Sequence, residues 1–401
     1  MTTHQSLLSA EQWRRLIESV FKPAADERRL ALLVDIPDDG RPDDPPWLDR
    51  RRLAQEWLEG LRGAFSAERL EIELWLYPNA RTNNGDLPDR VWEWGDLASA
   101  PLPSHVRELP EAGSSPFSSL FETCPLFIAM SELSATAPLK VAARQYGFRA
   151  ATMPGFAREM MPALALDFED VDRRCRVLKS LLDRAERADF LFETLPEGQE
   201  HRLRLDLRHR QSHASSGLLK TPGTAGNLPS GETYIVPYEG ELTADPSRSE
   251  GHLPVELDGE VVVYEIRANR AVRAQGQGPR SEVENQRLER EPAYANVAEL
   301  GLGVLGELGV DPVGEILLDE KLGLHIAFGR SDHFGGQVGP DDFSSKAAVV
   351  HIDRVYLPLP EAKVRSRSVR LSGKDGRGVD LMADGRYLID FAAQAEDLWK
   401  A

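Results

Sequence analysis

Residues 201–210 read HRLRLDLRHR, a run in which apolar and charged side chains alternate. Side chains on a strand point in turn to opposite faces, so this alternation predicts a strand with one buried face and one face in water. The sequence changes character at this run, from mixed helical and strand patterns before it to strand patterns after it. We therefore predict an α/β domain over residues 1–195 and a β-rich α+β domain over residues 196–401.

The half before this run alternates between short apolar segments and helical patterns. The runs LALLVDI, LEIELWLYPN and PLFIAMSE predict buried strands at 30–36, 70–79 and 125–132. Apolar residues at helical spacing predict helices over 11–21, 48–64 and 169–188. This strand–helix–strand alternation favours a parallel or mixed sheet covered by helices. Residues 80–118 contain several prolines, and we expect an irregular loop there.

Composition and charge exclude several classes of function. The net charge of −17 at pH 7 argues against binding to nucleic acids or membrane surfaces, because both require a basic face. The two cysteines, Cys124 and Cys175, stand in unrelated contexts and predict no disulfide framework. The N-terminus lacks the apolar core of a signal peptide, and no run approaches about 18 consecutive apolar residues. These features predict a cytoplasmic protein without a membrane span.

Two segments of the β-rich half place a glutamate beside a turn or break. In GNLPSGETYIVP (226–237), a tight turn delivers Glu232 at the start of a strand. In VAELGLG (297–303), Glu299 precedes a glycine-rich break, and taken alone this segment is typical of a helix end. Neither glutamate by itself indicates a site, because most glutamates in such positions are solvated.

Two further segments bring histidines close to acidic residues. In LLDEKLGLHIAFG, Glu320 stands five residues before His325, whose neighbours are apolar. In AAVVHIDRV, His351 and Asp353 flank one isoleucine. On a strand these two side chains point to the same face, so they can reach one ion together. Two histidines and one carboxylate are a minimal ligand set for a divalent transition metal, and the two glutamates named above would provide oxygen donors for a second ion.

The ordered set GNLPSGE, AELGLG, LLDEKLGLHIAFG and VVHID resembles the aminopeptidase T (thermophilic leucyl aminopeptidase) family of metallopeptidases. The resemblance covers roughly residues 150–390. It implies an aminopeptidase-like hydrolase of peptides or small amides that acts as a homodimer. Its C-terminal catalytic domain would bind two divalent metal ions, with zinc, cobalt or manganese as the expected metals.

Carried over residue by residue, the resemblance assigns five metal ligands: Glu232, Glu299, His325, His351 and Asp353. One of the glutamates, Glu299, would bridge the two ions, and Glu320 would be a further ligand or the acid/base. Two ions lower the pKa of a shared water and polarise the scissile carbonyl, and a free carboxylate can carry the proton to the leaving amine.

The sequence departs from the family at two places and leaves a second function open. After AELGLG, where the family is expected to have an asparagine-proline element, this chain reads VLGELGVDPVG. The family commonly has a tyrosine shortly after the HIAFG segment, where this chain reads RSDHFGGQ with Asp332 and His333. The dihydroxypyridine ring-cleaving dioxygenases resemble the same fold and keep two histidines and an aspartate around one ferrous ion. In that family the glutamate after the PSG turn is replaced by a non-ligand. Because Glu232 is present here, two-metal hydrolysis is favoured and a single-iron dioxygenase is the alternative.

Overall fold

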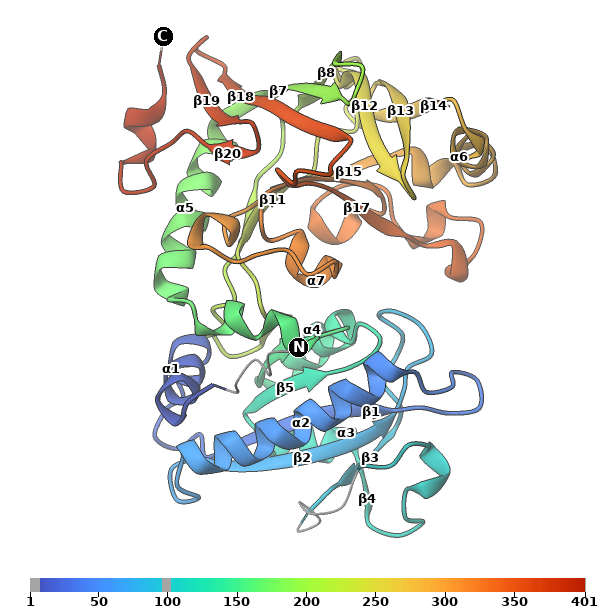
Figure 1. The fold of residues 1–401 in the computed structure, drawn as a ribbon. Helices are drawn as coiled ribbons and strands as arrows, with labels where there is room; N and C mark the ends of the chain where they lie inside the picture. Colours follow the sequence, from blue (N-terminus) through green and yellow to red (C-terminus); the bar gives the residue numbers. More distant parts are fainter. Residues whose placement is uncertain (1–7, 96–101, 401) are drawn as a thin grey trace. The chain divides into compact units, whose positions relative to one another are not determined.

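The computed structural model describes residues 8–95 and 102–400, which divide into two compact units (Figure 1). The first unit consists of three segments: Met1–Asp170, Ser215–Ser230 and Val313–Leu318. The second unit also consists of three: Val171–Ala214, Gly231–Pro312 and Asp319–Ala401. The chain thus passes from one unit to the other several times, and neither unit is a single continuous segment.

The first unit is built on a mixed seven-stranded sheet with the strand order β10-β6-β5-β1-β2-β3-β4. Its strands are β1 (Arg29–Ile36), β2 (Glu71–Pro78), β3 (Arg90–Glu93), β4 (Ser114–Pro116), β5 (Leu126–Met130), β6 (Arg149–Thr152) and β10 (Thr224–Asn227). The strands from β10 to β2 run parallel, and the short strands β3 and β4 add an antiparallel edge. Central strands of a parallel sheet are buried on both faces, which explains why β1 and β5 read as continuous apolar runs.

Helices cover both faces of this sheet (Figure 1). They are α1 (Ala10–Val20), α2 (Pro45–Ala64), α3 (Phe117–Thr123) and α4 (Thr136–Tyr146). On one side α1 packs on α2, where the rings of Trp13 and Trp57 lie 4.8 Å apart edge to face. On the other side α3 and α4 pack on Ala31 and Leu33 of β1. The aromatic side chains of these helices provide much of the apolar area that stabilises the unit.

The second unit contains two antiparallel sheets. One has the strand order β17-β16-β15-β11-β9 and the other β14-β13-β12-β8-β7-β18-β19-β20. The five-stranded sheet consists of β9 (His213–Ser215), β11 (Glu232–Ile235), β15 (Val297–Gly303), β16 (Leu324–Gly329) and β17 (His351–Tyr356). The eight-stranded sheet consists of β7 (Ala185–Thr194), β8 (Gln199–Asp206), β12 (Glu250–Leu257), β13 (Glu260–Arg267), β14 (Arg270–Gln275), β18 (Val364–Gly373), β19 (Gly378–Ala383) and β20 (Arg386–Tyr387). Of the remaining α-helices, α5 (Phe168–Arg184) and α6 (Pro279–Arg290) lie mostly or wholly in the second unit, and most of α7 (Ile316–Asp319) belongs to the first.

The predicted fold class is confirmed, since an α/β sheet is followed by β-rich antiparallel sheets. The alternation at 201–210 corresponds to β8, whose apolar residues Leu203 and Leu205 are buried while Arg202 and Arg204 are exposed. None of the helices in the described residues combines the length and hydropathy of a membrane-spanning segment. Both cysteines are buried and free.

Three local predictions differ from the structure. The segment 297–303, which alone is typical of a helix end, is the fully buried strand β15, because its neighbours in the sheet supply hydrogen-bond partners on both sides. The helix predicted to reach 188 ends at Arg184, where β7 begins pairing with β18. The loop predicted at 80–118 contains β3 and β4, and its residues 96–101 lie outside the described residues.

Candidate metal centre

The register of the five-stranded sheet gathers four charged side chains on one face. Glu299 of β15 pairs across the sheet with an alanine of β16, which in turn pairs with Asp353 of β17. One step along, Gly301 pairs with His325. Paired residues in antiparallel strands point to the same face, and so do residues two apart on a strand. His351, two residues from Asp353, therefore lies on this face as well.

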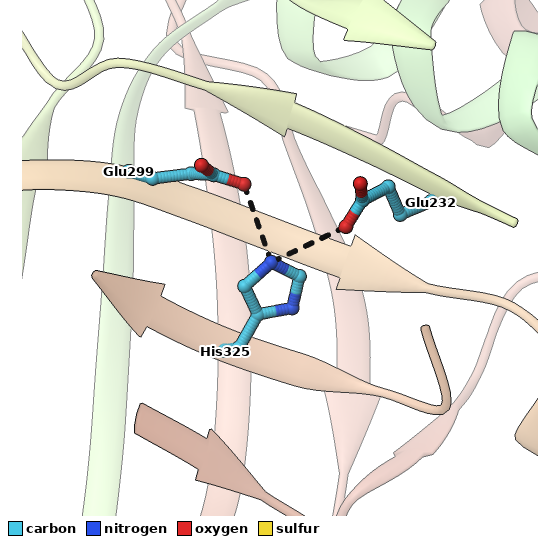
Figure 2. A group of neighbouring side chains, drawn as sticks. All are labelled: Glu232, Glu299 and His325. Atoms are coloured by element: carbon cyan, nitrogen blue, oxygen red, sulfur yellow. Dashed lines mark hydrogen bonds and ion pairs between the residues drawn. The ribbon is translucent and has the colours of Figure 1, made fainter. Parts of the chain in front are cut away.

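One group of donors is centred on the imidazole of His325 (Figure 2). Its Nε2 lies 3.2 Å from Oε1 of Glu299 and 3.4 Å from Oε2 of Glu232. All three side chains are buried. They come from three neighbouring strands, β16, β15 and β11, and their donor atoms lie within 4.8 Å of one another. We call these three residues the buried group.

A second group shares Glu299 with the first. The Nε2 of His351 lies 3.1 Å from Oε2 of Glu299 and 3.5 Å from Oδ1 of Asp353. The other ring nitrogen of His351 lies 2.8 Å from the carbonyl oxygen of Arg330. A proton on that nitrogen leaves Nε2 free as a ligand, an arrangement typical of metal-binding histidines. We call Glu299, His351 and Asp353 the open group, because the side chains of His351 and Asp353 are only half-buried.

The two oxygens of Glu299 are divided between the groups. Oε1 faces His325 and Oε2 faces His351. This division is what a carboxylate would need to bridge two adjacent cations.

The electrostatics of both groups are those of paired ions. Burial alone would lower the pKa of His325, but Glu299 and Glu232 outweigh it and raise that pKa to about 9. Burial alone would raise the pKa of Glu299, but the hydrogen bonds from His325 and His351 hold it at about 2. Burial alone would also lower the pKa of His351, but Asp353 and Glu299 raise it. A divalent cation that binds these residues therefore displaces protons from the imidazoles.

One carboxylate oxygen of the buried group supports a fit to a cation. Oε2 of Glu232 lies 3.4 Å from Nε2 of His325 but is buried without a hydrogen-bond partner among the described residues. A buried carboxylate oxygen without a donor is costly, and a metal ion removes that cost. Imidazole nitrogen with carboxylate oxygen is a donor set that zinc, cobalt, manganese and iron accept. The residues present therefore fit divalent transition metals.

Lys321 neutralises part of the acidic charge beside the buried group. Its side chain is 2% exposed, and Nζ donates to Oε1 of Glu232 at 2.6 Å and to Oε1 of Glu320. The structure thus places Glu320 against the lysine rather than in either donor group. Burial raises the pKa of Glu320 to about 8, although Lys321 opposes the shift. Sequence reasoning missed this lysine, although a lysine within the largely apolar run LLDEKLGL could have indicated a buried ion pair.

Gly301 is a second residue that sequence reasoning missed. A Cβ on Gly301 would lie 1.8 Å from Nε2 of His325, so the imidazole occupies the space above the glycine. The glycine is visible in the sequence as part of GLG, after Glu299. Only the pairing of β15 with β16 shows that its missing side chain leaves room for the imidazole of His325.

Aromatic rings border the centre. The ring of Tyr234, on β11, stacks on His213 at 5.4 Å and lies 4.6 Å from Phe334. Phe334 and His333 each lie 5.5 Å from the ring of His351. The residues at the family's tyrosine position are therefore near the open group: His333 lies beside His351, and Asp332 is bound by Arg330.

Comparison with known proteins gives similarity in structure alone. No family model matches the sequence, and no curated protein matches it. The chain is similar to 2,5-dihydroxypyridine dioxygenase from Pseudomonas putida KT2440, with a TM-score of 0.59 and 15% identity over 96% of this chain and 99% of that one. It is also similar to wild-type AmpT from Thermus thermophilus, with a TM-score of 0.53 and 15% identity over 95% of this chain and 98% of that one.

This chain has the fold of both proteins. At 15% identity the comparison shows the fold and leaves the reaction open. The two families expected from the sequence motifs are those of the two similar structures, so the resemblance is supported at the level of the fold. Which chemistry this chain performs has to be argued from its own residues.

Proposed function

We propose that this protein is a metal-dependent hydrolase of the aminopeptidase kind, which cleaves peptides or small amides with a two-ion centre. The observation that carries the proposal is the shared carboxylate of Glu299, whose two oxygens face two separate donor groups. A centre for a single ion has no need of a carboxylate divided in this way. The proposal includes the homodimer expected from the family resemblance.

In this proposal Glu232, Glu299 and His325 would hold one ion, and Glu299, His351 and Asp353 would hold the other. Two bound divalent ions supply an activated water at neutral pH and a polarised carbonyl. The tautomer of His351 is fixed by its contact with the carbonyl oxygen of Arg330, so its Nε2 is kept available.

Glu320 fits the role of proton carrier better than that of a ligand. It belongs to neither donor group, and burial raises its pKa above the ordinary value, so it can hold a proton near neutral pH. A carboxyl group with such a pKa can take a proton from the attacking water and return it to the leaving amine. Lys321 holds Glu320 and Glu232 at fixed positions, so the carrier and the buried group keep a constant geometry.

The first test is the metal content of protein purified without chelators, followed by assays on a panel of aminoacyl amides with zinc, cobalt or manganese. We expect close to two ions per chain and release of amine. A matched pair of variants sharpens the result: Glu232→Gln should remove one ion and Asp353→Asn the other. Two ions retained in both variants would contradict the assignment of the ligands.

One observation favours a second candidate, a mononuclear iron dioxygenase. Lys321 already brings a positive charge to Glu232, so this carboxylate has a cationic partner without a metal. A single ferrous ion would then be held by His325, His351 and Asp353, a combination of two histidines and one carboxylate. One iron per chain, with oxygen consumed on a dihydroxypyridine and no amide cleaved, would select this candidate. Glu232→Gln should then leave the iron content unchanged.

A further inference from the structure

We propose that Tyr234 is a further catalytic residue of this centre. Its phenolic hydroxyl would donate a hydrogen bond to the substrate oxygen that gains negative charge during amide hydrolysis. The inference rests on the proposed hydrolase function and adds to it a residue outside both donor groups.

The register of the sheet places Tyr234 next to the buried group. Tyr234 stands two residues after Glu232 on β11, so the two side chains point to the same face. It pairs across the sheet with Gly301, which pairs with His325 on the next strand. Since Gly301 has no side chain and the imidazole of His325 fills the space above it, no other side chain of that row separates the tyrosine from the imidazole.

The hydroxyl of Tyr234 differs from those of the other tyrosines in the second unit. Five of these donate to an identified acceptor: Tyr238, Tyr264, Tyr294, Tyr356 and Tyr387. Within residues 8–95 and 102–400, no hydrogen bond joins the hydroxyl of Tyr234 to another residue, whereas a buried phenol normally finds such a partner. The side chain of Tyr234 is only half-buried, so water or a ligand can reach its hydroxyl. A donor held without such a partner beside a charged centre is available to a ligand.

The ring of Tyr234 is held in place from two sides. His213 stacks on it, with an angle of 27° between the planes, and Phe334 contacts it at 4.6 Å. Phe334 itself lies in the turn that follows β16, and Ser331 at the start of that turn is bonded to Glu239 at 2.6 Å. Glu239 also accepts the backbone N–H of Gln337 at 2.6 Å, on the far side of the turn. A hydroxyl on a ring fixed in this way is preorganised, as a catalytic donor has to be.

The step balances without any further reagent. The water oxygen forms a bond to the carbonyl carbon while the π pair of the C=O bond moves onto the carbonyl oxygen. The phenol of Tyr234 donates a hydrogen bond to this oxygen and keeps its proton. When the electron pair returns, the C–N bond breaks, and the amine leaves with the proton that the water gave to Glu320.

The experiment uses the full zinc-loaded chain and its Tyr234→Phe variant. We expect kcat for leucine amide to fall by about 10²–10³, the usual cost of losing one oxyanion donor, with KM nearly unchanged. A second readout needs no turnover: the affinity for the phosphonic acid analogue of leucine, a tetrahedral oxyanion, should fall by about 10² in calorimetry. The metal content should remain that of the unchanged protein.

The control is Tyr356→Phe, which removes a hydroxyl bonded to the carbonyl oxygen of Pro254 in the same unit. It should lower stability by about 1 kcal/mol and leave kcat and the phosphonate affinity unchanged. If Tyr234→Phe keeps the kcat and phosphonate affinity of the unchanged protein at equal metal content, the role of Tyr234 is refuted while the hydrolase function stands. If the unchanged protein binds its ions and cleaves no amide, the proposed function fails and this role fails with it.

Discussion

The buried and open groups share Glu299, yet they differ in their surroundings. In the buried group His325 is 1% exposed, whereas the side chain of His351 in the open group is 19% exposed. A buried ammonium, Lys321, accompanies the first, and two aromatic rings, His333 and Phe334, border the second.

This difference indicates a division of labour within one centre. The buried group has its charges compensated by the protein itself, so its geometry is stiff and its donors are shielded from water. The open group is partly exposed to solvent, so in the proposed enzyme water and substrate would arrive there. Charge–charge interactions are stronger where water is excluded, and substitutions in the buried group should therefore cost more than equivalent ones in the open group.

The largest expected effect follows from the residue that both groups share. Glu299→Gln removes the negative charge from both, so we expect both ions to be lost and kcat/KM to fall by at least about 10³, because the ions supply several kcal/mol of transition-state stabilisation. Elemental analysis and amide hydrolysis measure this. Asp353→Asn should weaken metal binding only in the open group. A variant of Glu299 that retained two ions would contradict the bridging role.

The next effect separates the buried group from the open one. Gly301→Ala places a Cβ 1.8 Å from the present position of His325 Nε2, so the imidazole has to move. We expect one ion to be lost and the affinity of the other to change less than about 10-fold. Metal titration measures both. Gly63→Ala is the control, because nothing lies within 4 Å of a Cβ there, and helical alanine should add about 0.5–1 kcal/mol of stability.

The buried Lys321 should contribute to the free energy of unfolding. Lys321→Met leaves two carboxylates without their cation, so we expect the metal-free chain to lose about 3–5 kcal/mol of unfolding free energy in urea. Arg15→Met removes one positive charge from an exposed pair on α1 and should cost less than about 0.5 kcal/mol. Equal losses in the two variants would show that the ion pairs of Lys321 contribute no more to stability than an exposed pair does.

The smallest expected effect concerns pH. The pKa of His325 in the folded chain is raised to about 9, so its contribution to stability is present below its unfolded value of about 6.5 and is lost as pH rises through about 9. We therefore expect the metal-free chain to lose about 3 kcal/mol between these limits, measured as a falling Tm. The metal-loaded chain should lack this fall, because the ions replace the protons. A metal-free Tm that rises over this interval would contradict the assigned ion pairs.

The sequence determined the kind of fold and the identity of the donors. Alternation at 201–210 and the apolar runs at 30–36 and 125–132 fix local structure, because periodicity of side chains depends on neighbours along the chain. Apolar neighbours made His325 conspicuous, whereas Glu232 and the pair around Ile352 were assigned as donors by the order of the four segments and the family resemblance.

The tertiary structure decided how those residues meet. The segment 297–303 alone is typical of a helix end, yet it forms the strand β15, because its glycines are tolerated when flanking strands pair with it. The roles of Gly301, Lys321 and Tyr234 depend on which strand lies beside which, and residues far apart in sequence are joined by register alone. A one-residue slip would turn every side chain to the other face, so the centre exists only at this register. The sequence supplied the donors, and the sheet brought them together because strand pairing couples positions that local patterns leave independent.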